Sequence, residues 1–207
     1  MGSEMCIRDS TYTEIRGEPF IIDMMYAGLN NNMTGRAVYA EIGLGNRAFV
    51  HRDMWNVLQK AIPTLERLNL KMKICDAGRP VIAHRILTEI IPIKGFFALE
   101  PEKSQHCHGT AVDVCLCSPD GQELAYPTRV DAYEAQIAQE AQQGKTEKLA
   151  EQLKKARHDY EAPELKTEIG NRQQLKELME SIGLQSIPHE WWHYNLPGGL
   201  EYPLFDY

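Results

Sequence analysis

The chain has 207 residues, of which 43% are hydrophobic and 25% are charged, and its formal net charge is -7 at pH 7. A chain of this length and composition is expected to form one globular domain without help from disulfides. No apolar run approaches the ~20 residues of a membrane-spanning helix, and the basic residues gather on no single segment, so neither a membrane span nor a nucleic-acid partner is expected.

The first ten residues are expected to be a non-native leader, because Met5 to Ser10 resembles the translation of a sequencing-library transposon end. Residues 11–207 then form the single domain. The five cysteines are an odd set, and three of them crowd residues 107–117, which is more typical of a reducing compartment than of a secreted disulfide framework. A cytoplasmic location is therefore expected, and a periplasmic or exported one stays open if the native N-terminus is missing.

The first half of the chain mixes predicted strands and helices without a regular alternation. Apolar and alternating residues predict short strands at 21–22 and 71–75. Apolar residues at helical spacing predict helices over 54–68 and 81–91. Pro63 should kink the first of these helices or begin a second one.

The segment 131–160 is rich in Gln, Glu, Lys and Ala, and it is predicted to be a helical hairpin. The hairpin is either a solvated one packed along one edge or a lid or partner surface. Asn171 is predicted to cap a last helix that Gly183 ends, and the aromatic run after Pro188 predicts a strand. Together these elements predict an α+β domain with a mainly antiparallel sheet and flanking helices.

Two polar clusters carry groups that can bind a metal ion. His106 and Asp113 flank Gly109, and His193 follows Glu190 and two tryptophans. Zinc accepts imidazole nitrogen and carboxylate oxygen, and its catalytic sites have three protein ligands and an open position for water. His106, Asp113 and His193 could supply the three ligands, and Glu190 could take a proton from the water.

The second cluster sets a structural condition on this hypothesis. Glu190 and His193 would face opposite sides of a flat strand, because successive side chains alternate. A bulge or turn is therefore required at Trp191 and Trp192. Arg79, which follows a predicted strand, is a candidate for stabilising developing oxyanion charge, or else a surface ion-pair partner.

The cysteines suggest a competing site. Cys107, Cys115 and Cys117 with His108 offer soft zinc ligands. Alternatively, Cys115 and Cys117 share the face of Asp113 along a strand and pack as small core groups.

These segments resemble the D-alanyl-D-alanine dipeptidase family, the VanX-like branch of the zinc peptidases related to lysostaphin- and hedgehog-type metallopeptidases. The resemblance runs from about Ile22 onward. The family motif Ser-x-His-x-x-Gly-x-Ala-x-Asp is met by residues 104–113, and Glu-Trp-Trp-His by residues 190–193. The stretch 22–35 resembles the dipeptidases more than the carboxypeptidases of the same fold. The resemblance implies a hedgehog/DD-peptidase-like fold and hydrolysis of a D,D-dipeptide, D-Ala-D-Ala to two D-Ala.

The resemblance also implies roles for single residues. It implies one zinc ion per chain on His106, Asp113 and His193, with Glu190 as general base and acid. By the same resemblance, Arg79 polarises the scissile carbonyl and its tetrahedral oxyanion.

The implied substrate pocket holds a small dipeptide. Tyr26 and Ser104 would line it, and Asp131 would pair with the substrate ammonium, on a loose match in which Thr128 and Asp131 are identities. Gly78 departs from the family, which usually has an aromatic residue there, and the 131–160 hairpin looks longer than the family's loop.

Two other functions remain open at this point. A D,D- or L,D-carboxypeptidase trimming peptidoglycan peptides would need an open cleft for a longer substrate. A non-catalytic zinc-binding module would not need Glu190, which is present.

Overall fold

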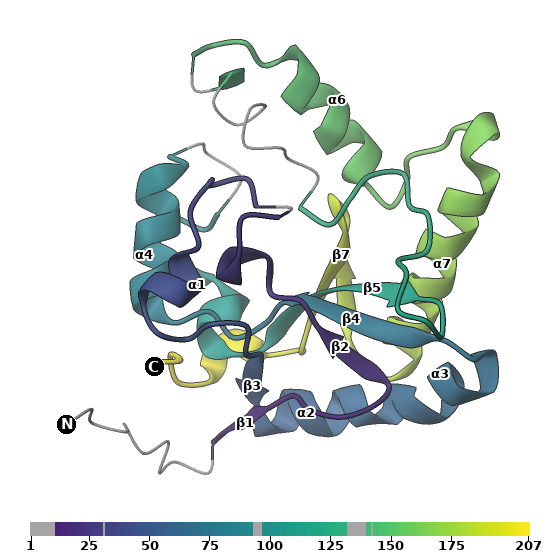
Figure 1. Cartoon of the computed structure of the whole chain (residues 1–207), viewed down its shortest axis with the longest axis horizontal. Helices are drawn as coiled ribbons and strands as arrows, with labels where there is room; N and C mark the ends of the chain where they lie inside the picture. The colour runs from purple at the N-terminus through teal and green to yellow at the C-terminus, as the bar shows by residue number, and fades with distance from the viewer. Residues whose placement is uncertain (1–10, 31, 93–96, 132–139, 142) are drawn as a thin grey trace.

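A five-stranded sheet with strand order β2-β4-β5-β7-β6 lies at the centre of the computed structural model, which describes residues 11–30, 32–92, 97–131, 140–141 and 143–207 (Figure 1). A two-stranded ribbon of β1 and β3 lies beside it. Strand β2 runs parallel to β4, and the other pairs are antiparallel. The strands are β1 (Tyr12–Glu14), β2 (Phe20–Ile22), β3 (Phe49–His51), β4 (Lys71–Asp76), β5 (Ala111–Cys117), β6 (Gln185–Ile187) and β7 (Glu190–Asn195). The predicted α+β class with a mainly antiparallel sheet is confirmed.

Helices flank the sheet and pack against it. Helix α3 contacts β4, and α7 contacts β5, β6 and β7, whereas α6 lies at the outer edge of the molecule (Figure 1). The helices are α1 (Val38–Glu41), α2 (Arg52–Leu58), α3 (Ile62–Leu68), α4 (Val81–Ile90), α6 (Glu147–Ala156) and α7 (Lys166–Ser181).

Most of the predicted elements are present close to their expected bounds. The strands expected at 21–22 and 71–75 are β2 and β4, and the helix expected at 81–91 is α4. The helix expected over 54–68 is divided by a 3-10 turn, and Pro63 lies in the first turn of the second part, α3. Proline is tolerated there because the first N–H groups of a helix have no intrahelical partner.

The start of α7 differs from the prediction. The helix begins at Lys166, so Asn171 lies inside it and is not its cap. The Asn171 side chain instead donates a hydrogen bond to the carbonyl of Ala125 at 2.9 Å. A 3-10 turn at Pro163–Leu165 leads directly into the helix, so the helix starts earlier in the sequence than predicted. The end is as predicted, since Gly183 follows with φ +104°.

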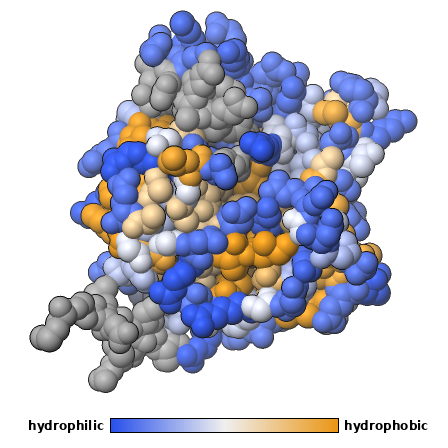
Figure 2. Space-filling view, viewed as in Figure 1, coloured by the Kyte–Doolittle hydropathy of each residue, from blue (hydrophilic) through white to orange (hydrophobic). Residues whose placement is uncertain are grey.

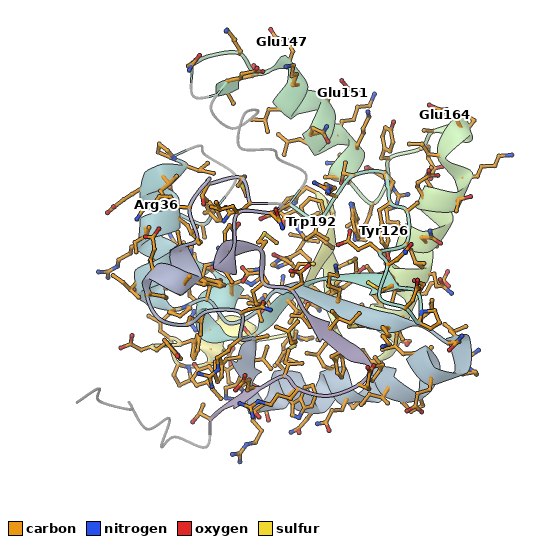
Figure 3. The ribbon with its side chains drawn as sticks, viewed as in Figure 1. Arg36, Tyr126, Glu147, Glu151, Glu164 and Trp192 are labelled. Atoms are coloured by element: carbon orange, nitrogen blue, oxygen red, sulfur yellow. The ribbon has the colours of Figure 1, made fainter. Side chains whose placement is uncertain are left out.

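The predicted hairpin is described only in its second half, because residues 132–139 and 142 lie outside the described part of the chain. That half contains α6, which buries Leu149 and Ala156 while Leu153 stays 38% exposed. Hydrophilic residues cover the surface above it (Figure 2), and Glu147 and Glu151 lie on the outer side of the helix (Figure 3). This half therefore packs along one edge.

The two tryptophans of β7 anchor that strand in the core. Trp191 and Trp192 are fully buried, and Figure 3 shows Trp192 near the centre of the fold. The Trp191 ring stacks on Tyr126 at a centroid distance of 4.0 Å, and its Nε1 donates to Thr128 Oγ1 at 2.8 Å. These contacts hold the strand that carries His193.

Candidate active site

Three metal-binding side chains from separate segments converge beside the central sheet. His106 lies in the 3-10 turn Gln105–His108, Asp113 lies in β5, and His193 lies directly opposite Asp113 in β7. One ligand atom from each lies within 4.8 Å of the other two. Strand pairing therefore brings together the three residues that the sequence singled out.

The two imidazoles and the carboxylate face one another through lone pairs. His106 Nδ1 lies 2.7 Å from the carbonyl oxygen of Ala77, which only accepts, so His106 Nε2 keeps its lone pair. His193 Nε2 faces Asn195 Oδ1 at 2.9 Å, which leaves Nδ1 as the acceptor. His193 Nδ1 lies 3.2 Å from His106 Nε2 and 2.9 Å from Asp113 Oδ1. Two imidazole lone pairs and a carboxylate repel one another unless a cation lies among them. This set of ligand atoms therefore fits a divalent metal such as zinc.

The electrostatics of the cluster point the same way. Burial alone would raise the pKa of Asp113, but the adjacent His106 and His193 lower it far below its usual value. Burial would lower the pKa of His106, but Asp113 and Asp76 raise it. The site therefore favours positive charge at its centre, and a metal ion would replace the protons there.

Glu190 lies beside the cluster because of an irregularity in the sheet. Between β6 and β7 the register jumps from Ser186 opposite Tyr194 to Ile187 opposite Glu190, which is the bulge required at the tryptophans. Glu190 Oε2 lies 3.8 Å from His193 Nδ1. Burial raises the pKa of Glu190 to about 8. A carboxyl group with such a pKa can both take up and release a proton near neutral pH.

Arg79 is a buried cation rather than a surface ion-pair partner. Its side chain is 5% exposed, and its Nη2 and Nε lie 2.5 and 3.2 Å from Asp76 Oδ2. The guanidinium also lies over the rings of Tyr26 and Phe97, 5.4 and 5.0 Å from their centroids. Asp76 is itself held by the hydroxyl of Tyr39 at 2.6 Å. Arg79 is thereby fixed at the wall of the pocket.

Asp131 contributes a further carboxyl group to the same pocket. The hydroxyl of Tyr26 donates to Asp131 Oδ2 at 2.7 Å. Burial, followed by the charge of Asp113, raises the pKa of Asp131 to about 7. Its backbone has φ +57°, a left-handed conformation that Asp adopts more readily than most residues and that recurs at functional sites.

A cavity of about 400 Å³ joins these groups. Its lining includes seven of the eight residues predicted from the sequence, while the eighth, Tyr26, lies fully buried behind Asp131. Ser104 is 8% exposed at its wall. The volume suits a small ligand. The predicted residues in the lining are Arg79, Ser104, His106, Asp113, Asp131, Glu190 and His193.

Several residues of this site were not predicted. Asp76 and Tyr39 fix Arg79, Phe97 covers it, and Asn195 contacts His193. Asn195 could have been found, because it stands two positions after His193 on a strand and so shares its face. Tyr39 and Phe97 carry no comparable signal in the sequence.

The competing cysteine site is not supported. Within the described part of the chain, the cluster suited to a metal contains His106, Asp113 and His193 and no cysteine. Cys107, Cys115 and Cys117 are buried free thiols. Burial raises the pKa of Cys107 to about 11, which disfavours the thiolate that would bind zinc.

Two comparisons with known proteins found similar sequences. The model of the peptidase M15 family, described as D-ala-D-ala dipeptidase, matches residues 17–206. The chain is also 27% identical to D-alanyl-D-alanine dipeptidase of Escherichia coli (strain K12) over 183 residues, which cover 88% of this chain and 82% of that protein. Among the described residues, no helix has the length and apolar character needed to cross a membrane.

Proposed function

Because the chain belongs to the peptidase M15 family of D-Ala-D-Ala dipeptidases, we propose that it is a zinc-dependent dipeptidase that hydrolyses D-Ala-D-Ala to two D-Ala. The observation that carries the proposal is the carboxylate of Glu190 beside a buried His-Asp-His cluster in a small cavity. A purely structural metal site would not need that carboxylate.

In this proposal His106, Asp113 and His193 hold zinc, which when bound supplies a Lewis acid and lowers the pKa of water. Glu190 takes one proton from the attacking water as the new C–O bond forms. Arg79 donates hydrogen bonds to the carbonyl oxygen as negative charge develops on it. Glu190 then gives its proton to the leaving nitrogen as the C–N bond breaks, so one water is consumed and two amino acids are released.

Asp131 supports a dipeptide rather than a longer substrate. A free amino terminus is a cation, and a carboxylate held by Tyr26 in a buried position is suited to pair with it. A residue added before the ammonium would remove that charge from the reach of Asp131 and leave the carboxylate unpaired. The geometry therefore favours substrates whose amino terminus lies one residue from the scissile bond.

The substrate is tested by comparing rates of amine release from three peptides with the zinc-loaded protein. We expect cleavage of D-Ala-D-Ala, and far slower cleavage of L-Ala-L-Ala and of a pentapeptide that ends in D-Ala-D-Ala. Equal rates on the pentapeptide and the dipeptide would overturn the dipeptidase proposal in favour of a carboxypeptidase.

A further inference from the structure

Asn195 contacts one of the three residues of the metal-binding cluster from the side away from the cluster. It is the last residue of β7, two positions after His193, so the two side chains share a face of the strand. Asn195 Oδ1 lies 2.9 Å from His193 Nε2. The other ring nitrogen, Nδ1, faces Asp113 and His106.

The chemistry of this contact selects one form of the imidazole. A neutral histidine carries its hydrogen on either Nδ1 or Nε2, and the carbonyl oxygen of an amide only accepts. The contact with Asn195 therefore places the hydrogen on Nε2 and leaves a lone pair on Nδ1. With the hydrogen on Nδ1, that nitrogen would donate to Asp113 Oδ1 at 2.9 Å and could not bind a metal ion.

The backbone holds Asn195 in place on both sides. Its strand partners are Ala111 of β5 and Gln185 of β6. The next residue, Leu196, donates its N–H to the carbonyl of Thr110 at 2.8 Å. The backbone of Asn195 is therefore fixed by neighbouring strands on both sides.

We propose that Asn195 is a positioning residue that keeps His193 in the Nε2–H form, with Nδ1 free for the metal. The proposal rests on the proposed zinc site and adds a residue to it. Groups that hydrogen-bond the outer nitrogen of a ligand histidine fix its tautomer and orientation, and their loss weakens metal binding by about 10- to 100-fold.

The test uses Asn195→Ala, which removes the acceptor, and Asn195→Asp, which keeps one. Gln185→Ala is the matched control, because Gln185 pairs with Asn195 on the neighbouring strand and has an exposed side chain. Zinc affinity is measured by competition with a chromophoric chelator. The tautomer of His193 is read from nitrogen NMR shifts of the zinc-free proteins, recorded at rising pH until the shifts no longer change.

We expect Asn195→Ala to bind zinc about 10- to 100-fold more weakly and to shift His193 toward the Nδ1–H form, with Asn195→Asp and Gln185→Ala close to wild type. An Asn195→Ala affinity within twofold of wild type, or an Nδ1–H form in the zinc-free wild type, would overturn the role of Asn195 while leaving the zinc site in place. A wild type that binds no zinc would overturn the proposed function itself.

Discussion

Arg79 owes its position to one buried carboxylate. Asp76 is fully buried and accepts hydrogen bonds from Arg79, from the hydroxyl of Tyr39 and from the N–H of Ala77. The Ala77 carbonyl in turn fixes His106. Asp76, which was not predicted as part of the site, thus supports both Arg79 and the proposed ligand His106.

We expect Asp76→Asn to lower the free energy of unfolding by about 3–5 kcal/mol, because the guanidinium of Arg79 would stay buried without a counter-charge. Urea unfolding measures the change. Lys176→Ala, which breaks a surface pair with Glu180, is the comparison, with an expected loss of about 0.3–0.5 kcal/mol. Similar losses in the two variants would show that Asp76 does not neutralise Arg79.

Asp131 is expected to act on substrate selection rather than on the fold. Asp131→Asn should lower kcat/KM for a dipeptide with a free amino terminus by about 10- to 100-fold, the value of one charged hydrogen bond. The same change should leave the slow hydrolysis of an N-acetylated dipeptide nearly unchanged, because that substrate has no ammonium. An equal loss of kcat/KM on both substrates would show that Asp131 does not bind the substrate ammonium.

Among single residues, the sequence predicted those that line the cavity better than those that support them from behind. The pattern of residues 104–113 and 190–193 suffices to select Glu190 and the three residues that could hold a metal ion. Asp76 lies only three residues before Arg79, whereas the contacts that Tyr39 and Phe97 make with this pair depend on separate backbone segments meeting in space. Gly78 is now explained, since a Cβ there would lie 2.5 Å from the carbonyl oxygen of Phe49.

Among the elements, the irregular pairing of β6 with β7 matters most for the site. In a regular strand Glu190 and His193 would point to opposite faces, and the register shift at the tryptophans brings both into the cavity. The requirement for this bulge followed from the chemistry expected of the two residues. The start of α7 did not follow from capping residues, because the preceding 3-10 turn begins the helix earlier.

The segment between α6 and α7 carries a half-buried histidine, His158, whose ring lies edge-on to Tyr194 at a centroid distance of 6.4 Å. Neither ring nitrogen has a hydrogen-bond partner among the described residues. Burial, with smaller contributions from Lys176 and Arg172, lowers the pKa of His158 from 6.5 to about 4. Between these two pH values the unfolded chain binds the proton more readily than the folded protein does.

Stability should therefore fall as the pH drops from about 6.5 to about 4, and less steeply in His158→Phe. We expect a difference of about 1 kcal/mol between the two proteins at the acid end, because partial exposure screens the effect. Melting temperatures across this pH range measure it. His84, whose pKa burial also lowers to about 4, is present in both proteins, so the difference isolates His158. Parallel pH profiles would contradict this assignment.

For the whole molecule, the order of strands in the sheet explains how the site is assembled. Strands β4, β5 and β7 are neighbours, although β7 lies far from the other two in the sequence. Their pairing brings the segments that carry Arg79, Asp113 and His193 to one cavity of about 400 Å³. The sequence indicated the class of fold and the residues, whereas the facing lone pairs of the two imidazoles become visible only after the strands are paired.

The proposed hydrolysis of D-Ala-D-Ala depends on zinc and on Glu190 together. The most direct test measures amine release from this dipeptide by wild type and Glu190→Gln, with the zinc content of each protein determined in the same samples. We predict one zinc per chain in both proteins and a rate about 10²- to 10⁴-fold lower in the variant, because the proton acceptor is lost while the ligands remain. An unchanged rate in Glu190→Gln, or no hydrolysis by the zinc-loaded wild type, would contradict the claim.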